Sequence, residues 1–256
     1  MEHEGIHVAI AAEKLGTWMG IPITNTLLMA WLVVIALGAV GFFVSRRLAL
    51  VPNRAQSLFE MMVEGVGNFM ESTLESRELA RRYFPLITSI FLFIFIGNLF
   101  EFIPGVGTVY YHSVHGEAAP LFRSMNTDLN VTLALAIISF LVIEISGIVM
   151  IGFFKYFSRF VPFGAFRGGI GNGLISMFVG IIEFVSELIR LISFSFRLFG
   201  NIFAGEVLLA VIAYFVPVLI PVPFMLFELF VGFMQAAIFS LLTLFFIKLA
   251  VTETAH

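Results

Sequence analysis

The sequence contains no cysteine and few charged residues. Only 12% of its 256 residues are Asp, Glu, Lys or Arg, about half of the roughly 25% found in soluble domains. Without cysteine the chain can form no disulfide, no thiolate metal site and no cysteine nucleophile. Its net charge of −3 provides no basic surface for nucleic acid. Disulfide-stapled, thiol-dependent and nucleic-acid-binding proteins are therefore excluded.

Apolar residues dominate instead. They make up 60% of the chain and include 32 phenylalanines, and the mean hydropathy is +1.04. One soluble core cannot bury this much apolar surface, so lipid must be the solvent for much of the chain. Because backbone groups in lipid have to be satisfied internally, the spanning segments are expected to be helices.

Several apolar stretches are long enough to cross a bilayer as helices. They cover residues 26–45, 84–102, 129–154, 174–213 and 224–251. Residues 48–82 alternate charged and apolar side chains at helical spacing, which predicts an amphipathic helix on the membrane surface, and residues 1–25 precede the first span. The predicted fold class is an all-α integral membrane protein, a single domain from 1 to 256 with about five membrane-inserted helices plus one amphipathic surface helix.

The last two stretches differ from the others in length. Residues 174–213 contain no proline, and a helix of that length would measure about 60 Å, about twice the hydrocarbon thickness of a bilayer. Such a helix must lie obliquely or bend. Pro217, Pro221 and Pro223 mark a turn before the final stretch. We therefore expect a long, strongly tilted hairpin.

The basic residues predict an orientation. Most Lys and Arg residues lie in 46–82, in 155–167 and at Lys248, whereas Lys14 and Arg123 lie in the opposite loops. Basic residues gather on the cytoplasmic side, so the N-terminus is expected outside and the C-terminus in the cytoplasm. The acidic start of the chain lacks the features of a cleaved leader, and we expect no processing and a bacterial inner membrane.

Ionisable residues inside the long hairpin are the strongest functional signal. An arginine at membrane depth costs about 2.5–3.5 kcal/mol on insertion scales and normally marks a pathway or a partner. At 100° per residue, one stripe of the first long helix holds several such residues together. The stripe contains the ionisable residues Glu183, Glu187, Arg190 and Arg197, together with Phe194 and Asn201. A stripe of this kind cannot face hydrocarbon and must meet water or another protein's helices.

Three further polar residues extend this pattern. Glu206 lies about 180° from Arg197 around its helix, so the two charges are expected to serve different surfaces. On the final helix, Glu228 and Gln235 share a face, and Gly232 between them leaves room for water or a neighbouring helix.

One segment resembles a known family. Residues 195–206, with the sequence SFRLFGNIFAGE, resemble the signature of the a subunit of F-type ATP synthases. Residues 91–104, residues 126–132 and the surroundings of Gln235 are also similar, so the resemblance covers most of the chain after Phe84. The N-terminal third is less similar.

The resemblance implies roles for individual residues. Arg197 corresponds to the family's essential arginine, Asn201, Glu206 and Gln235 to polar positions near it, and Glu183 to a carboxylate on the cytoplasmic access path. It implies a stationary subunit that passes protons to a rotating c-ring through two offset half-channels. It also implies peripheral-stalk b subunits as partners, no cofactor and no independent enzymatic activity.

Other assignments are less direct. Where some family members carry a histidine opposite the carboxylate of Glu206, this sequence has Glu228, which would give the outer pathway two acids. We expect Asn201 and Gln235 to position Arg197 through hydrogen bonds. Glu187 belongs either to the cytoplasmic path with Glu183 or to a structural ion pair with Arg190.

Some roles stay open. Glu144, in the third span, has no counterpart in the family pattern and could face either access path. Whether the coupling ion is a proton or sodium is expected to depend on the ring.

Two rival classes remain at this stage. A secondary ion-coupled transporter predicts an internal repeat with paired broken helices, and the sequence contains no such repeat. An intramembrane hydrolase needs a nucleophile with a base in reach, and the predicted spans contain no histidine. His112 and His115 lie in a loop without the spacing of a metal site. The chain also lacks a phosphate-binding Gly-x-x-x-x-Gly-Lys loop.

Overall fold

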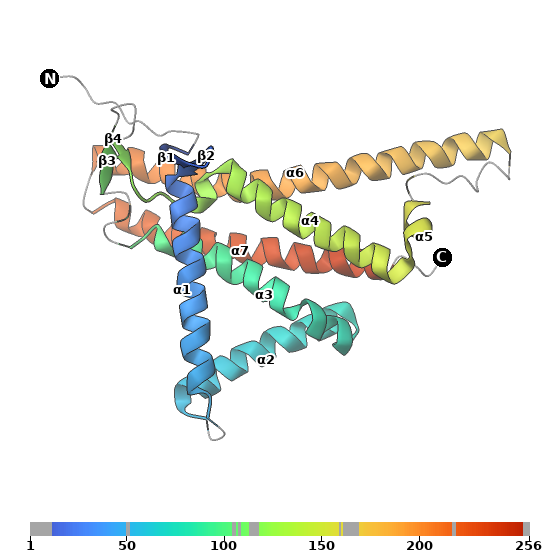
Figure 1. Ribbon diagram of the computed structural model, residues 1–256, viewed down its shortest axis with the longest axis horizontal. Helices are drawn as coiled ribbons and strands as arrows, with labels where there is room; N and C mark the ends of the chain where they lie inside the picture. Colours follow the sequence, from blue (N-terminus) through green and yellow to red (C-terminus); the bar gives the residue numbers. More distant parts are fainter. Residues whose placement is uncertain are drawn as a thin grey trace.

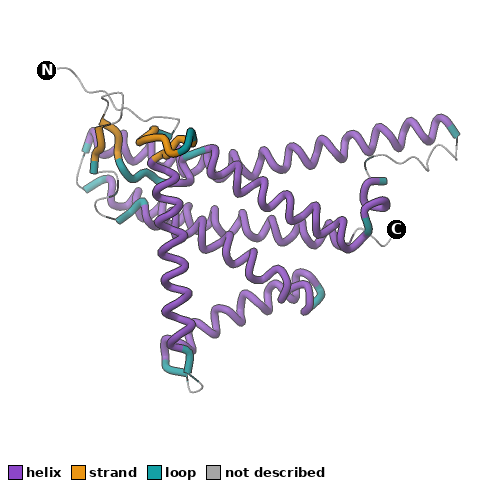
Figure 2. The backbone as a smooth tube through the Cα atoms, in the orientation of Figure 1, coloured by secondary structure: helices purple, strands orange, loops and turns teal. Residues whose placement is uncertain are grey.

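The computed structural model describes residues 12–49, 52–103, 106, 109–112, 118–158, 160, 169–216 and 219–252. Helices make up nearly all of this part (Figures 1 and 2). The long helices are α1 (Asn25–Arg47), α2 (Arg54–Leu74), α3 (Arg77–Phe100), α4 (Leu129–Ile151), α6 (Ile170–Phe215) and α7 (Pro221–Thr252). The short elements are β1 (Lys14–Trp18), β2 (Ile21–Thr24), β3 (Tyr110–His112), β4 (Ala118–Pro120), the 3₁₀ turn η1 (Met125–Thr127) and α5 (Phe153–Phe157).

Among the described residues, five helices are long and apolar enough to cross a membrane. They are α1, α3, α4, α6 and α7. The predicted fold class is thereby confirmed, and the chain is a multi-pass membrane protein. The two small antiparallel hairpins, β1–β2 and β3–β4, were not predicted, because short irregular segments outside the spans carry no periodic apolar signal.

The predicted surface helix 48–82 is divided in the structure. Helix α2 ends at Leu74, and Glu75 adopts a left-handed backbone with φ +53°. Ser76 then caps α3 by accepting a hydrogen bond from the Leu79 backbone nitrogen, the usual role of serine before a helix. Residues 77–82 are consequently the first turns of the spanning helix α3. The charge pattern alone did not reveal this break.

An ion pair fixes the turn between α2 and α3. Lys248 Nζ on α7 lies 2.7 Å from Glu75 Oε1. The hydrogen bond from Lys248, and then its positive charge, hold the pKa of Glu75 below its usual range. The turn is thus tied to the C-terminal end of α7.

The third span also ends earlier than predicted. Helix α4 stops at Ile151, and Gly152 has φ +89°, a conformation that glycine adopts without strain. The chain then turns into α5, which lies beside the end of α4 (Figure 1). Residues 159 and 161–168, between the predicted spans 129–154 and 174–213, lie outside the described residues.

Helix α7 lies at the centre of the molecule. It packs against α3, α4 and α6. One buried apolar cluster joins these four helices through Ile94 of α3, Ala136 of α4, Leu198 of α6 and Ala236 of α7. Helix α1 lies at the edge, where Met29 and Val33 are its buried apolar residues against Met125.

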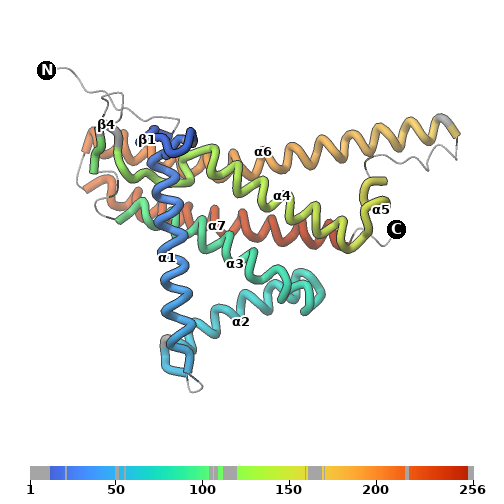
Figure 3. Tube along the Cα trace, in the orientation of Figure 1, coloured from blue at the N-terminus to red at the C-terminus, as the bar shows by residue number. Residues whose placement is uncertain are grey.

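Helices α6 and α7 form an antiparallel hairpin. Helix α6 is continuous from Ile170 to Phe215, about 69 Å at 1.5 Å per residue, and α7 is about 48 Å long by the same rise. Both run across the direction of α1 (Figure 3). Pro221 and Pro223 lie in the first turn of α7 and not in a turn before it, because proline is tolerated where the backbone nitrogen needs no partner. The tilt of this hairpin in a bilayer stays a prediction.

Candidate proton-pathway site

Arg197 lies exposed on α6. Its Nη2 donates a hydrogen bond to Ser193 Oγ, one turn earlier, at 3.3 Å. No carboxylate of the described residues pairs with it, and in this part of the chain it makes no hydrogen bond to Asn201 or Gln235. Gln235 is instead buried in α7. The expected hydrogen bonds that would position Arg197 are therefore not formed in this structure.

The surroundings of Arg197 form an exposed helix face, here called the Arg197 face. It consists of Ser186, Ser193, Arg197, Gly200, Asn201, Ala204 and Leu208. Several of these side chains are small, and a Cβ added to Gly200 would have nothing within 4 Å. Small residues let a second helix approach closely. The face is thus flat, polar at its centre and uncovered by the described part of the chain.

The predicted stripe on α6 lies partly inside and partly outside the surface that packs against α4 and α7. Glu187 and Phe194 are buried, whereas Arg197 and Asn201 are exposed. The reason is geometric, because Phe194 and Arg197 differ by about 60° around the helix. One edge of the stripe packs against α4 and α7, and the other edge remains open.

Glu206 forms a partly buried ion pair with Arg123. Arg123 Nε and Nη2 donate to the two carboxylate oxygens of Glu206 at 3.2 and 3.0 Å, which is the strong two-point geometry that arginine makes with carboxylates. The side chain of Arg123 is 6% exposed and that of Glu206 is 27% exposed. Arg123 lies between β4 and η1, and from the sequence it was expected only as a charge in an outer loop.

Glu228 of α7 lies close to this pair. It is 6% exposed, and neither carboxylate oxygen has a hydrogen-bond partner among the described residues. Its carboxyl group packs on Gly205 of α6, where an added Cβ would lie 2.6 Å from Glu228 Cδ. Glu101, which follows α3, lies within electrostatic range of Glu228, Glu206 and Arg123. The two acids expected in the outer pathway are thus brought together, with a third acid that the sequence analysis did not single out.

A cavity of about 300 Å³ connects the acidic group with the Arg197 face. Glu228 and Gly205 line it near the acids. Asn201, one turn beyond Arg197, lines it as well. The rest of its lining is mainly apolar and includes Leu209, Phe224 and Phe227, so the cavity brings Glu228 and Asn201 to one space without being a polar channel throughout.

Asparagine side chains hold α7 in register below this cavity. Asn98 of α3 donates to the backbone oxygen of Gly232 at 3.0 Å, and Asn126 of η1 donates to Asn98 Oδ1 at 2.6 Å. A Cβ on Gly232 would lie 3.0 Å from Asn98 Cβ, so a larger residue there would crowd Asn98. The space that the sequence predicted at Gly232 is occupied by a neighbouring helix.

A second polar group lies toward the N-terminal part of α6. Glu187 is 3% exposed and Glu183 is partly buried. Glu187 and Arg190 line a cavity of about 20 Å³ with Tyr156, and the Arg190 guanidinium lies 4.0 Å from the ring centre of Phe246. The structure therefore places Glu187 and Arg190 together, far along the helix from Glu206.

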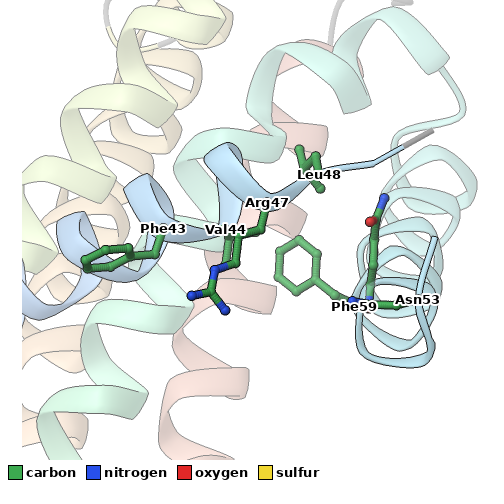
Figure 4. A pocket seen from close by; sticks show the side chains of 7 residues that line it. Phe43, Val44, Arg47, Leu48, Asn53 and Phe59 are labelled. Atoms are coloured by element: carbon green, nitrogen blue, oxygen red, sulfur yellow. The ribbon is translucent and has the colours of Figure 1, made fainter. Parts of the chain in front are cut away.

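Another hollow has a different character. It measures about 700 Å³ and lies between the end of α1 and the start of α2. Figure 4 shows Phe43, Val44 and Arg47 on α1, with Asn53 and Phe59 across from them. Apart from Arg47 it contains no ionisable side chain, and it includes none of the residues expected on a proton path.

Metal binding finds no support in the described residues, which contain no group of three His, Cys, Asp or Glu side chains suited to an ion. His112 lies in β3, and His115 lies outside the described residues.

Comparison with known proteins agrees with the sequence signature. A family described as ATP synthase A chain matches residues 27–248. The chain is 34% identical over 231 residues to ATP synthase subunit a of Sulfurihydrogenibium sp. (strain YO3AOP1), covering 90% of this chain and 98% of the relative. It is 36% identical over 218 residues to the subunit a of Campylobacter jejuni (strain RM1221), covering 85% and 86%. For the Moorella thermoacetica protein the identity is 30% over 227 residues, covering 89% and 90%. The chain therefore belongs to the ATP synthase A chain family.

Proposed function

We propose that this chain is the stator ion-channel subunit of an F-type ATP synthase. In this role it passes protons to and from the carboxylates of a rotating c-ring through two offset half-channels, and so couples ion flow to rotation and ATP synthesis. Its relatives carry the name ATP synthase subunit a. In this role the chain provides the path for protons and the charge of Arg197, and the nucleotide chemistry belongs to other subunits of the complex.

The observation that carries this proposal is the exposed Arg197. Its guanidinium stays ionised at any biological pH, and it lies on a membrane helix where an unpaired charge facing hydrocarbon is costly. The small residues of the Arg197 face admit another helix at close range. A ring of helices that presents carboxylates to this face would satisfy the charge.

The mechanism follows from that pairing. A ring carboxylate moving through lipid travels protonated, because desolvation disfavours its charged form. Near Arg197 the charged form is favoured, since opposite charges at about 4 Å attract by about 4 kcal/mol at an effective dielectric near 20. The ring site then releases its proton. Because Arg197 cannot give up its own charge, it also blocks direct passage between the half-channels.

The two polar groups are assigned to the two half-channels. Glu206 and Glu228 would line the outer one, and the 300 Å³ cavity leads from Glu228 toward Asn201. Glu183 and Glu187 would line the cytoplasmic one. The structure of the chain alone shows no hydrogen bond from Arg197 to Asn201 or Gln235 in its described part. Asn201 and Gln235 are proposed to form hydrogen bonds with Arg197 once the ring is in place.

The assembly and its orientation are also proposed. The partners are the c-ring and peripheral-stalk b subunits in a bacterial inner membrane, with the N-terminus outside and the C-terminus cytoplasmic. Arg46 and Arg47 at the end of α1, Arg54, the three arginines at the start of α3 and Lys248 support this orientation.

ATP-driven acidification of inverted membrane vesicles tests the proposal. Vesicles containing the Arg197→Ala variant should show no acidification, although the complex assembles in normal amount. Arg54→Ala, which removes an exposed arginine of α2, is the matched control and should pump at the native rate. Native-rate pumping by Arg197→Ala would refute the proposed function and favour a transporter.

A further inference from the structure

Glu144 and Tyr156 form a hydrogen-bonded pair that the mechanism above does not use. Tyr156 Oη of α5 donates to Glu144 Oε2 of α4 at 2.7 Å. The other carboxylate oxygen, Glu144 Oε1, is buried and has no hydrogen-bond partner among the described residues. Leaving a buried acceptor without a hydrogen bond lowers the free energy of unfolding. Stabilisation of the fold is therefore a weak explanation for this pair.

Packing fixes the position of the Tyr156 hydroxyl. Tyr156 is 3% exposed. Its ring lies on Gly147 of α4, where an added Cβ would be 3.1 Å from Tyr156 Cδ2, and its edge meets the ring of Phe160 with 5.9 Å between centres. A ring held on two sides cannot swing away from Glu144.

Tyr156 also reaches the second polar group. It lines the cavity of about 20 Å³ together with Glu187 and Arg190 of α6, a volume that accommodates a single water molecule. The same tyrosine therefore touches Glu144 on one side and the Glu187 cavity on the other. α4 and α6 are linked at this point by groups that can exchange protons.

The ionisable groups around Tyr156 come from two helices in the described part of the chain. Glu144 belongs to α4, and Glu187 and Arg190 belong to α6. Helix α7 contributes Phe246, Leu249 and Ala250, which bind no proton. Glu144, Tyr156 and the cavity shared with Glu187 therefore form one connected set of groups along which a proton can move.

We propose that Glu144 and Tyr156 form the entrance relay of the cytoplasmic half-channel. Tyr156 gives its hydroxyl proton to the Glu144 carboxylate and takes a proton from the cavity onto the same oxygen, so one proton moves and the tyrosine is unchanged. The reverse sequence moves a proton from Glu144 to the cavity shared with Glu187. This inference rests on the proposed function, because it assigns Glu187 to the cytoplasmic half-channel.

The test uses assembled complexes in inverted vesicles, where ATP-driven pumping draws protons from the cytoplasmic face. Tyr156→Phe removes the hydroxyl but keeps the packed ring, and Glu144→Gln keeps the shape but cannot carry the proton. Tyr214→Phe, at the exposed end of α6, and Glu64→Gln, on the exposed side of α2, are the matched controls.

Pumping by Tyr156→Phe and by Glu144→Gln should fall about tenfold when the cytoplasmic face is at about pH 8, where protons are scarce, and stay near the native rate at about pH 6. The double variant should pump no more slowly than either single variant, because the two groups act in series. The control variants should match the native complex at both pH values.

Two results would overturn the relay. One is native-rate pumping by both variants at every pH, and the other is a loss that does not change with pH, which indicates a packing role. Arg197→Ala is measured in parallel. If it stops pumping while Tyr156→Phe has no effect, only the relay is wrong, and if it pumps normally, the proposed function is wrong. Should Glu144→Gln fail to assemble, Tyr156→Phe decides the question alone.

Discussion

Two arginines near the α6–α7 hairpin have opposite surroundings. The side chain of Arg123 is 6% exposed and makes two hydrogen bonds to Glu206. Arg197 is exposed and bonds only Ser193 on its own helix, as far as the described residues show. The charge of Arg123 is matched inside the chain, whereas no carboxylate in the described part of the chain matches that of Arg197.

This contrast distinguishes Arg123, whose charge stabilises the fold, from Arg197, whose charge is proposed to act on the ring. A buried arginine paired with a carboxylate contributes to the fold and becomes costly when its partner is removed. An exposed arginine on a membrane helix contributes little to the fold and needs a partner elsewhere. The contrast predicts that removing Arg123 lowers stability far more than removing Arg197 does.

Removing the buried charge should have the largest effect on stability. Arg123→Ala leaves Glu206 without a partner, so the free energy of unfolding should fall by about 3–5 kcal/mol. Arg197→Ala should change it by less than about 1 kcal/mol. Thermal unfolding of the purified membrane sector measures both.

A double variant supplies the control for this measurement. Arg123→Ala combined with Glu206→Gln leaves neither charge unpaired and should recover much of the lost stability. The contrast would be broken if Arg123→Ala and Arg197→Ala destabilised the complex equally.

Two glycines on α6 make the same comparison between a covered and an open side of the helix, with an effect on stability of intermediate size. A Cβ at Gly205 would collide with Glu228, whereas one at Gly200 meets nothing within 4 Å. Gly205→Ala should therefore lower the free energy of unfolding by about 1–3 kcal/mol. Gly200→Ala should leave it unchanged or raise it by up to about 1 kcal/mol, because alanine favours helix. Equal losses from both variants would show that Gly205 is not a contact point for Glu228.

The smallest effect is expected at the exposed pair of Lys248 and Glu75. Lys248 lowers the pKa of Glu75 from 4.5, so the stabilisation from this pair is present above pH 4.5 and is lost as the pH falls through the lowered pKa. Lys248→Met should remove this part of the acid dependence, and high salt should mimic the substitution. Melting temperatures recorded against pH check it, and an unchanged pH profile would refute it.

The sequence predicted the long elements better than the contacts between them. The apolar stretches predicted the spans, since membrane helices need only length and hydropathy to be recognised. The break at Glu75 and the end of α4 at Gly152 were missed because single backbone conformations decided them. The Ser76 cap was visible in the sequence but was masked by the strong charge periodicity around it.

The site was predicted in outline only. The spacing of Arg197 and Glu206 indicated opposite sides of α6, and in the structure one is exposed while the other pairs with Arg123. Arg123 and Tyr156 could not be assigned, because each reaches the site from a short segment between the spans, and only tertiary packing brings them there. Asn98 and Glu101 at the end of the second span were the available signal, since polar residues at such depth need partners.

Cross-linking at the Arg197 face tests most directly whether another protein covers it. The chain has no cysteine, so Ala204→Cys and Leu208→Cys each carry a single thiol for a photoreactive label, and Ile35→Cys on the exposed side of α1 is the control. In the assembled complex the two α6 labels should form adducts with the ring subunit, whereas the α1 label should not. Adducts with lipid alone at both α6 positions would contradict the proposal that a rotor pairs with Arg197.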